Sequence, residues 1–150
     1  MEKTAVIYAT RTKHSKKLAE AIGSALRVKA KNITENPTLH EIDLLFIVGG
    51  IYGGTSSPVL LEYITEMEAP ALKHAVLVTS CGSGKQRQDA VRRILEEKKI
   101  EVIDEFVCKG AIIFVSINHP NSKDLKEATD FALDIVGPMA KFDQDLRNLN

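Results

Sequence analysis

Three short segments of this chain combine residue types that could hold a small ligand. The first segment, TRTKHS (10–15), is rich in hydroxyl and basic side chains. The second segment, GGIYGG (49–54), places four glycines around an isoleucine and a tyrosine, and the third segment, SCGSGKQ (80–86), consists largely of small residues. Each segment follows an apolar run that predicts a buried strand, so all three are candidate binding turns.

The first segment leads into a helix predicted over residues 15–26, with Ser15 as its N-cap. A helix N-terminus offers free amides and a partial positive charge, so it attracts an anion such as phosphate. Thr10, Thr12 and Ser15 could add hydroxyl donors, and Arg11, Lys13 and His14 add basic groups. The alternative, that Ser15 only caps the helix beside a solvated basic face, stays equally open from this segment alone.

The second segment favours a ligand more strongly. Gly49, Gly50, Gly53 and Gly54 let the backbone approach a flat molecule closely, and Tyr52 beside Ile51 could stack on a planar ring. A tight strand–helix connection is the alternative, but such a connection rarely needs four glycines.

The third segment could offer backbone amides to the edge of a ring, through Ser80, Cys81, Gly82 and Ser83. A redox role for Cys81 is disfavoured because no partner cysteine or nearby base is evident. A small residue at the end of a buried strand is the favoured interpretation of this cysteine.

Apolar and amphipathic runs alternate along the chain. The predicted strands are 4–9, 27–33, 43–50, 74–84 and 100–110 with 111–116, and the predicted helices are 15–26, 56–67, 85–99 and 121–136. Because strands separated by helices pair in parallel, we expect one three-layer, doubly wound α/β domain over residues 1–150. Ligands bind such folds at the carboxyl ends of the strands, where all three segments fall. The tail, 141–150, is expected to fray or dock loosely.

Composition excludes several other classes. The chain is 44% hydrophobic and 27% charged, with 20 basic and 20 acidic residues, so nothing indicates a nucleic-acid or membrane partner. Two cysteines are too few for a disulfide scaffold and match no zinc motif, which suits reduced thiols in the cytoplasm. No apolar run has the length of a signal peptide or a membrane span.

The three segments, in this order, resemble those of flavodoxins. The family's first turn has the form T-x-T-G-x-T; here Thr10 and Thr12 match, Ser15 replaces the last threonine and Lys13 occupies the glycine position. EIDLLFIVGGIYGG resembles the second loop, VLVTSCGSG the third, and INHPNSKDLKEATDFALDIV the closing helix. The resemblance covers essentially the whole chain.

The resemblance implies a five-stranded parallel sheet in the order 2-1-3-4-5 and a non-covalently bound flavin mononucleotide (FMN). Its phosphate would lie on residues 10–15 and its isoalloxazine between 50–55 and 80–85. The implied function is electron transfer between redox partner proteins that the sequence does not identify, by a monomer or weak dimer. The implied FMN-binding residues are Thr10, Arg11, Thr12, Lys13, His14, Ser15, Gly50, Ile51, Tyr52, Gly53, Gly54, Ser80, Cys81, Gly82 and Ser83.

Two departures from the family pattern bear on this expectation. Lys13 crowds the backbone if its position needs a positive φ, although its ammonium group could pair with the phosphate. The third segment lacks an aromatic residue and the chain has no tryptophan, so stacking would depend on Tyr52 alone.

The residues support three alternatives to an electron carrier to different degrees. A phosphorylated receiver domain is nearly excluded, because the first and second segments carry no carboxylate. An FMN-dependent oxidoreductase acting on a quinone or another small substrate stays open, with His14 and His119 as candidate proton donors. A binding or regulatory domain with weakened or lost FMN binding also stays open, and the fold alone does not choose among these.

Overall fold

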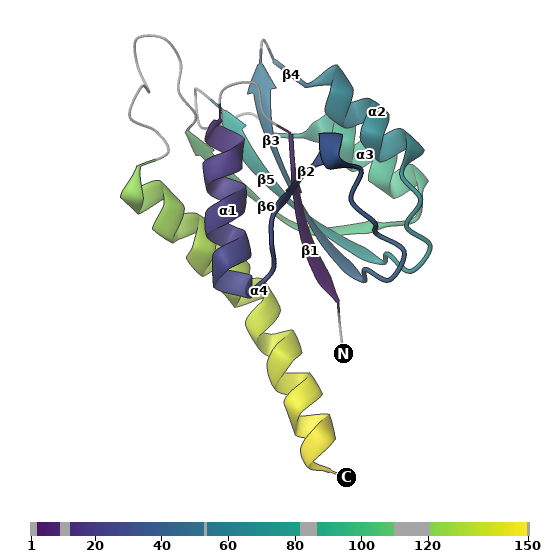
Figure 1. The fold of residues 1–150 in the computed structure, drawn as a ribbon, viewed down its shortest axis with the longest axis vertical. Helices are drawn as coiled ribbons and strands as arrows, with labels where there is room; N and C mark the ends of the chain where they lie inside the picture. The colour runs from purple at the N-terminus through teal and green to yellow at the C-terminus, as the bar shows by residue number, and fades with distance from the viewer. Residues whose placement is uncertain (1–2, 10–12, 53, 82–86, 110–120, 150) are drawn as a thin grey trace.

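The computed structural model describes residues 3–9, 13–52, 54–81, 87–109 and 121–149. Strands and helices alternate along the chain as the sequence predicts (Figure 1). The elements are β1 (Thr4–Tyr8), α1 (His14–Leu26), β2 (Lys31–Asn32), the 3₁₀ helix η1 (Ile33–Glu35), β3 (Leu44–Tyr52), β4 (Thr55–Ser56), α2 (Pro58–Glu66), β5 (His74–Cys81), α3 (Asp89–Glu97), β6 (Glu101–Lys109) and α4 (Ser122–Asn148).

The sheet has the order β2-β1-β3-β5-β6, and every pair along this path is parallel. The short strand β4 pairs antiparallel with the end of β3 and lies off the path. Counted without β4, this is the predicted order 2-1-3-4-5, and the predicted doubly wound α/β fold is confirmed.

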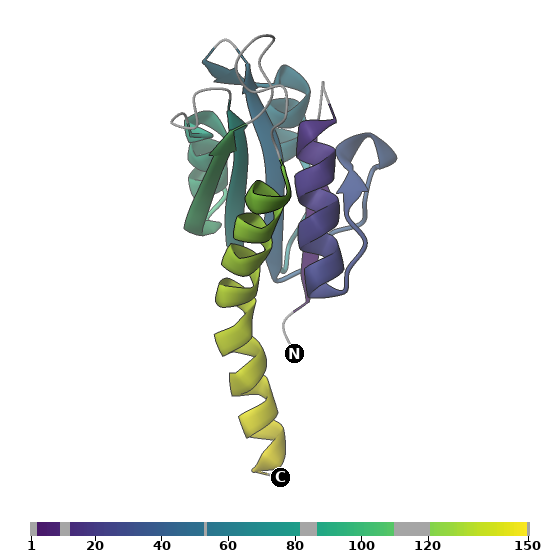
Figure 2. The same ribbon diagram turned by 90° about the vertical axis from the view of Figure 1, so that its left-hand side faces the viewer.

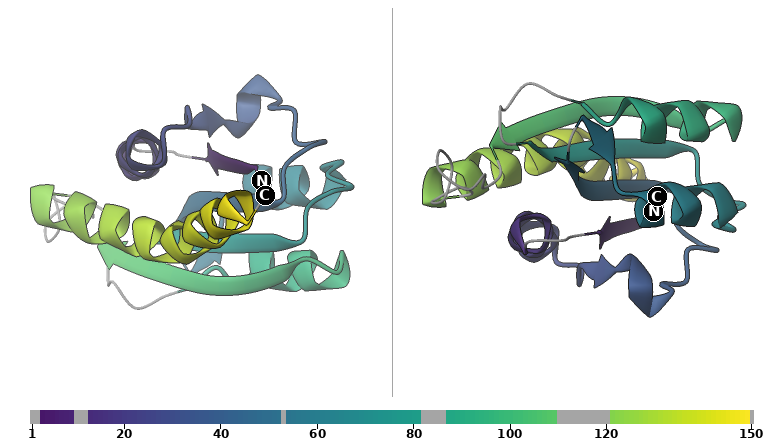
Figure 3. Two further views of the ribbon diagram at one scale, coloured as in Figure 1. Left: turned by 90° about the horizontal axis from the view of Figure 1, so that it is seen from below. Right: turned by 90° about the horizontal axis from the view of Figure 1, so that it is seen from above.

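Both faces of the sheet are covered by helices, which explains why its central strands are continuously apolar. Successive side chains of β3 alternate between two cores: Ile47 belongs to the core that includes Leu60 of α2 and Leu95 of α3, whereas Phe46 belongs to the one that includes Leu18 of α1 and Ala132 of α4. Figure 3 shows the sheet between these two pairs of helices. All six of these side chains are fully buried.

The edge strand β2 is shorter than the predicted 27–33. Arg27 takes a left-handed conformation (φ 60°) that ends α1, and the chain pairs with β1 only at Lys31 and Asn32. A capping box between Asn32 and Glu35 then starts η1. Hydrogen bonds of the side chains therefore stop the strand early.

Helix α4 runs to Asn148, well past its predicted end at residue 136. Its C-terminal half projects beyond the sheet instead of fraying (Figures 1 and 2). Within the part of the chain that the structure describes, neither α4 nor any other helix is long and apolar enough to cross a membrane. The strand predicted at 111–116 lies outside the described residues.

Gly23 allows the chain to turn back tightly over the end of α1. The Val28 amide donates to the Gly23 carbonyl over 2.9 Å, and a Cβ at Gly23 would lie 2.6 Å from the Val28 oxygen. Backbone atoms on both sides make this contact hard to relieve.

We therefore expect Gly23→Ala to lower the free energy of unfolding by about 1–3 kcal/mol, because overpacking outweighs the better helix propensity of alanine. Urea denaturation measures this change. Ser24→Ala, at the exposed neighbouring position, is the control and should gain about 0.5 kcal/mol. Equal gains at both positions would contradict the packing argument.

Candidate functional site

The carboxyl ends of β1, β3 and β5 lie at one edge of the sheet, here called the carboxyl edge. Parallel, in-register pairing places Tyr8 beside Val48 and Gly50 beside Ser80. The structure thereby brings the described parts of the three segments to one edge (Figure 2). These parts are Lys13, His14 and Ser15, Gly50, Ile51, Tyr52 and Gly54, and Ser80 and Cys81; the other predicted residues, Thr10, Arg11, Thr12, Gly53, Gly82 and Ser83, lie outside the described residues.

The start of α1 differs from the prediction. The helix begins at His14, and Lys13 occupies the N-cap position in a left-handed conformation with φ 69°. Ser15 is thus the second helical residue, so its predicted role as the N-cap is wrong. Position 13 does require a positive φ, the condition under which a lysine crowds the backbone.

Ser15 is completely buried, and its Oγ finds no hydrogen-bond partner among the described residues. An unsatisfied buried hydroxyl is costly unless a ligand or water completes it. It lies in the first turn of α1, where backbone amides have no partner within the helix. The arrangement therefore suits an anion with several acceptor oxygens.

Basic residues of α1 lie near this turn. Lys16 and Lys17 are exposed on α1, and Lys16 lies 3.8 Å from Glu20. Burial and, second, the charge of Lys17 lower the pKa of His14 below its usual value of 6.5. Without an anion beside it, the imidazole of His14 is therefore biased toward its neutral form.

The second segment is mostly strand, not turn. Strand β3 continues to Tyr52, and β4 folds back on it with Ile51 beside Ser56 and Tyr52 beside Thr55. The connection contains Gly54 with φ 85°, a conformation that favours glycine. The side chain of Ser56 is buried, and its Oγ has no partner in the described ranges. Sequence analysis did not single out this hydroxyl.

Gly49 has a packing role that the sequence did not reveal. A Cβ at this position would lie 2.8 Å from Leu60 Cδ2 and 3.0 Å from Gln88 Oε1. The glycine therefore lets α2 and the start of α3 approach β3 closely.

A cluster of polar side chains around a buried carboxylate lies beside the end of β5 and is here called the Glu105 cluster. It consists of Thr79, Arg87, Gln88, Arg92 and Glu105. Gln88 is fully buried, and the Glu105 side chain is only 1% exposed. Sequence analysis missed Glu105 because a charged residue in an edge strand usually faces solvent.

Cys108 on β6 lies beside Ser80, and its thiol is buried and outside any disulfide. Burial, followed by the charges of Asp124 and Glu127, raises the pKa of this thiol to about 12. The thiolate is therefore essentially absent at neutral pH, and Cys108 is a packing residue instead of a nucleophile.

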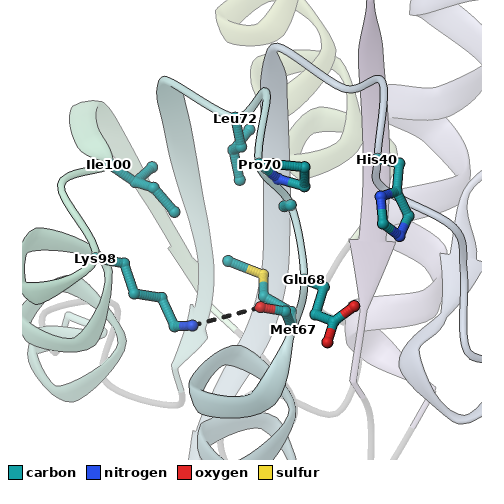
Figure 4. A pocket seen from close by; sticks show the side chains of 8 residues that line it. His40, Met67, Glu68, Pro70, Leu72, Lys98 and Ile100 are labelled. Atoms are coloured by element: carbon teal, nitrogen blue, oxygen red, sulfur yellow. Dashed lines mark hydrogen bonds between the residues drawn. The ribbon is translucent and has the colours of Figure 1, made fainter.

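Two adjoining pockets lie at the opposite, amino edge of the sheet. One has a volume of about 490 Å³ and is lined by residues that include His40, Glu68 and Ile100, and its neighbour of about 340 Å³ shares His40 and Glu68. Figure 4 shows Lys98 reaching across the larger pocket to the carbonyl of Met67, over 3.4 Å. No predicted site residue lines either pocket.

Residues 5–118 match the flavodoxin domain family. The chain belongs to this family. The resemblance inferred from the three segments is thereby confirmed, and the carboxyl edge is the end of the sheet at which open α/β folds bind their ligands.

Similar structures confirm the fold. A flavodoxin from the domain Archaea has 17% sequence identity and a TM-score of 0.71, over 91% of this chain and 97% of its own. A lysine-to-glycine variant of a Fusobacterium nucleatum flavodoxin, bound to flavin mononucleotide, has 18% identity and a TM-score of 0.63, over 87% of this chain and 92% of its own. An uncharacterized protein of Methanocaldococcus jannaschii is 27% identical over 137 residues, which cover 83% of this chain and 91% of that protein.

We expect Lys13→Gly to raise the free energy of unfolding by up to about 1 kcal/mol, because glycine adopts a left-handed conformation without a Cβ penalty. Lys13→Ala is the matched variant: it removes the same charge but keeps the penalty. Thermal and urea unfolding of both proteins measure the difference. Equal stabilisation by the two substitutions would assign the effect to charge instead of backbone conformation.

Proposed function

We propose that this flavodoxin-family protein binds FMN non-covalently and carries electrons between redox partner proteins. The observation that carries the proposal is Ser15, whose buried Oγ lacks a partner among the described residues at the start of α1. A family member with such an unsatisfied donor at a helix N-terminus has the chemistry that a phosphate group needs.

The phosphate end of the cofactor would be held by α1. Ser15 Oγ and the first-turn amides would donate to the phosphate oxygens, and the basic residues of the first segment would balance their charge. The Fusobacterium nucleatum flavodoxin bound FMN with glycine in place of a lysine. We therefore expect Lys13→Gly to retain FMN binding in this chain.

The ring end would lie against the second and third segments. The backbone at Gly50, Ile51 and Gly54 lies at the carboxyl edge, where a flat ring could approach it. Tyr52 is the proposed stacking residue. Bound FMN would supply one- and two-electron redox chemistry, while this chain supplies the binding groups, orientation and local polarity.

The first test is titration of the apoprotein with FMN, followed by quenching of flavin fluorescence. We expect Ser15→Ala to weaken binding about tenfold to a hundredfold, because a hydrogen bond to a charged group contributes about 1.5–3 kcal/mol. The apoprotein of this variant should be at least as stable as the parent, because an unsatisfied buried hydroxyl is removed.

Ser24→Ala, on the exposed side of the same helix, is the matched control and should leave affinity unchanged. Failure of the parent protein to bind FMN at roughly millimolar concentration, which corresponds to about −4 kcal/mol, would rule out the proposed function.

FMN binding should also raise the pKa of His14, because a phosphate dianion nearby favours the imidazolium form. In the apoprotein the pKa of His14 is lowered, so at a pH between its pKa values in the folded and unfolded states the unfolded chain binds more protons. The contribution of His14 to folding stability is therefore present above its pKa in the unfolded chain and is lost as the pH falls through its pKa in the folded protein.

NMR titration of the histidine resonances measures the pKa of His14 with and without ligand. Riboflavin, which lacks the phosphate, should leave it nearly unchanged, and the resonances of His40 at the amino edge are the internal control. A pKa of His14 that FMN and riboflavin shift equally would contradict phosphate binding on the first segment.

A further inference from the structure

Glu105 lies on β6, and its side chain is almost completely buried beside the end of β5. A buried carboxylate is tolerated only when charges and hydrogen bonds compensate for the lost water. The charged and hydrogen-bonding partners of Glu105 therefore indicate which parts of the fold this carboxylate connects.

The carboxylate joins the end of β5 to the residue that precedes α3. Thr79 Oγ1 and the Gln88 backbone amide both donate to Glu105 Oε2, each over 3.0 Å. These two residues bracket the third segment, one before it and one after it. A single carboxylate oxygen thus fixes the distance between the two ends of this part of the chain.

Two arginines on the α3 side balance the charge. Arg92 Nη2 donates to Glu105 Oε1 over 2.9 Å, and Arg87 Nη1 lies 3.9 Å from the same oxygen. The carboxylate also lies at the start of α3, where the helix dipole favours a negative charge.

Gln88 extends the cluster to β3. Its Nε2 donates to the Val78 carbonyl and to Thr79 Oγ1, each over 3.1 Å. Its Oε1 faces Gly49, the residue before Gly50 of the second segment. The cluster therefore contacts the strands that carry both the second and the third segment.

We propose that Glu105 is a positioning residue for the isoalloxazine part of the flavin site. It holds Thr79 and Gln88 at a fixed separation, and the side chain of Gln88 in turn lies against Gly49 of β3. This inference rests on the proposed function, and its test separates the failure of one from the failure of the other.

The test compares flavin affinities of Glu105→Gln and Thr79→Val with the parent protein. Glu105→Gln keeps the size of the side chain and removes its charge. Thr79→Val keeps the shape and removes the hydroxyl, which donates to Glu105 and accepts from Gln88. We expect each to weaken FMN binding about tenfold, the effect of losing about 1.4 kcal/mol. Riboflavin binding should weaken by the same factor, because the effect lies at the ring end.

Two further variants separate positioning from loss of stability. Thr79→Ser restores the hydroxyl and should recover parent affinity within about threefold. Ile64→Ala removes a buried side chain of α2 from the core, should lower the urea midpoint of unfolding, and should leave flavin affinity unchanged. If Glu105→Gln does not fold, the Thr79→Val and Thr79→Ser pair gives the same test.

Amide hydrogen exchange in the apoprotein supplies a measurement without flavin. The Gln88 amide should exchange faster in Glu105→Gln, because it loses its charged acceptor, while amides in the centre of β3 keep their protection. Parent affinity in both Glu105→Gln and Thr79→Val would overturn the positioning role, as would a loss confined to FMN or a loss of equal size in Ile64→Ala. No FMN binding by the parent protein would overturn the proposed function and this inference together.

Discussion

Parallel, in-register pairing of β1, β3 and β5 is the constraint on which the candidate site depends. It brings residues that are thirty to forty positions apart in sequence to one edge, as the pairs Tyr8 with Val48 and Gly50 with Ser80 show. The pairing is possible because side chains on both faces of the central strands are buried under helices. A shift of one residue in β3 would turn Phe46 and Ile47 toward the wrong cores and would displace the second segment as well.

Buried hydroxyl groups mark the carboxyl edge of the sheet. Ser15 and Ser56 keep buried hydroxyls there without partners in the described part of the chain, and Lys13 holds a left-handed conformation at the start of α1. Such costs persist only where the surrounding fold imposes them, and they are typical of functional sites. The two pockets at the amino edge are lined by none of the predicted site residues. The chemistry of the side chains therefore identifies the candidate site.

The sequence predicted what depends on apolar patterns and missed what depends on tertiary contacts. The buried runs at 4–9, 43–50 and 74–84 identified the central strands, because strands covered on both faces are apolar without alternation. Ser15 was misplaced as a cap because a hydroxyl before an amphipathic run is typical of both an N-cap and a first-turn residue. Glu105 could not be recognised, since its partners Thr79, Gln88 and Arg92 are brought together only by the fold.

The free energy of burying charge bears on why the Glu105 cluster is present. Replacing a buried ion pair by apolar residues of similar volume is often neutral or even stabilising, so the pair of Glu105 and Arg92 is poor evidence for stability. Apolar side chains make no directional contacts, so they tolerate small shifts of the groups packed against them. A carboxylate oxygen instead fixes a hydroxyl and a backbone amide at hydrogen-bond distance. The cluster lies where β3, β5 and α3 meet beside the second and third segments. Buried polarity at this place is therefore better explained by accurate placement of the carboxyl edge than by stability of the core.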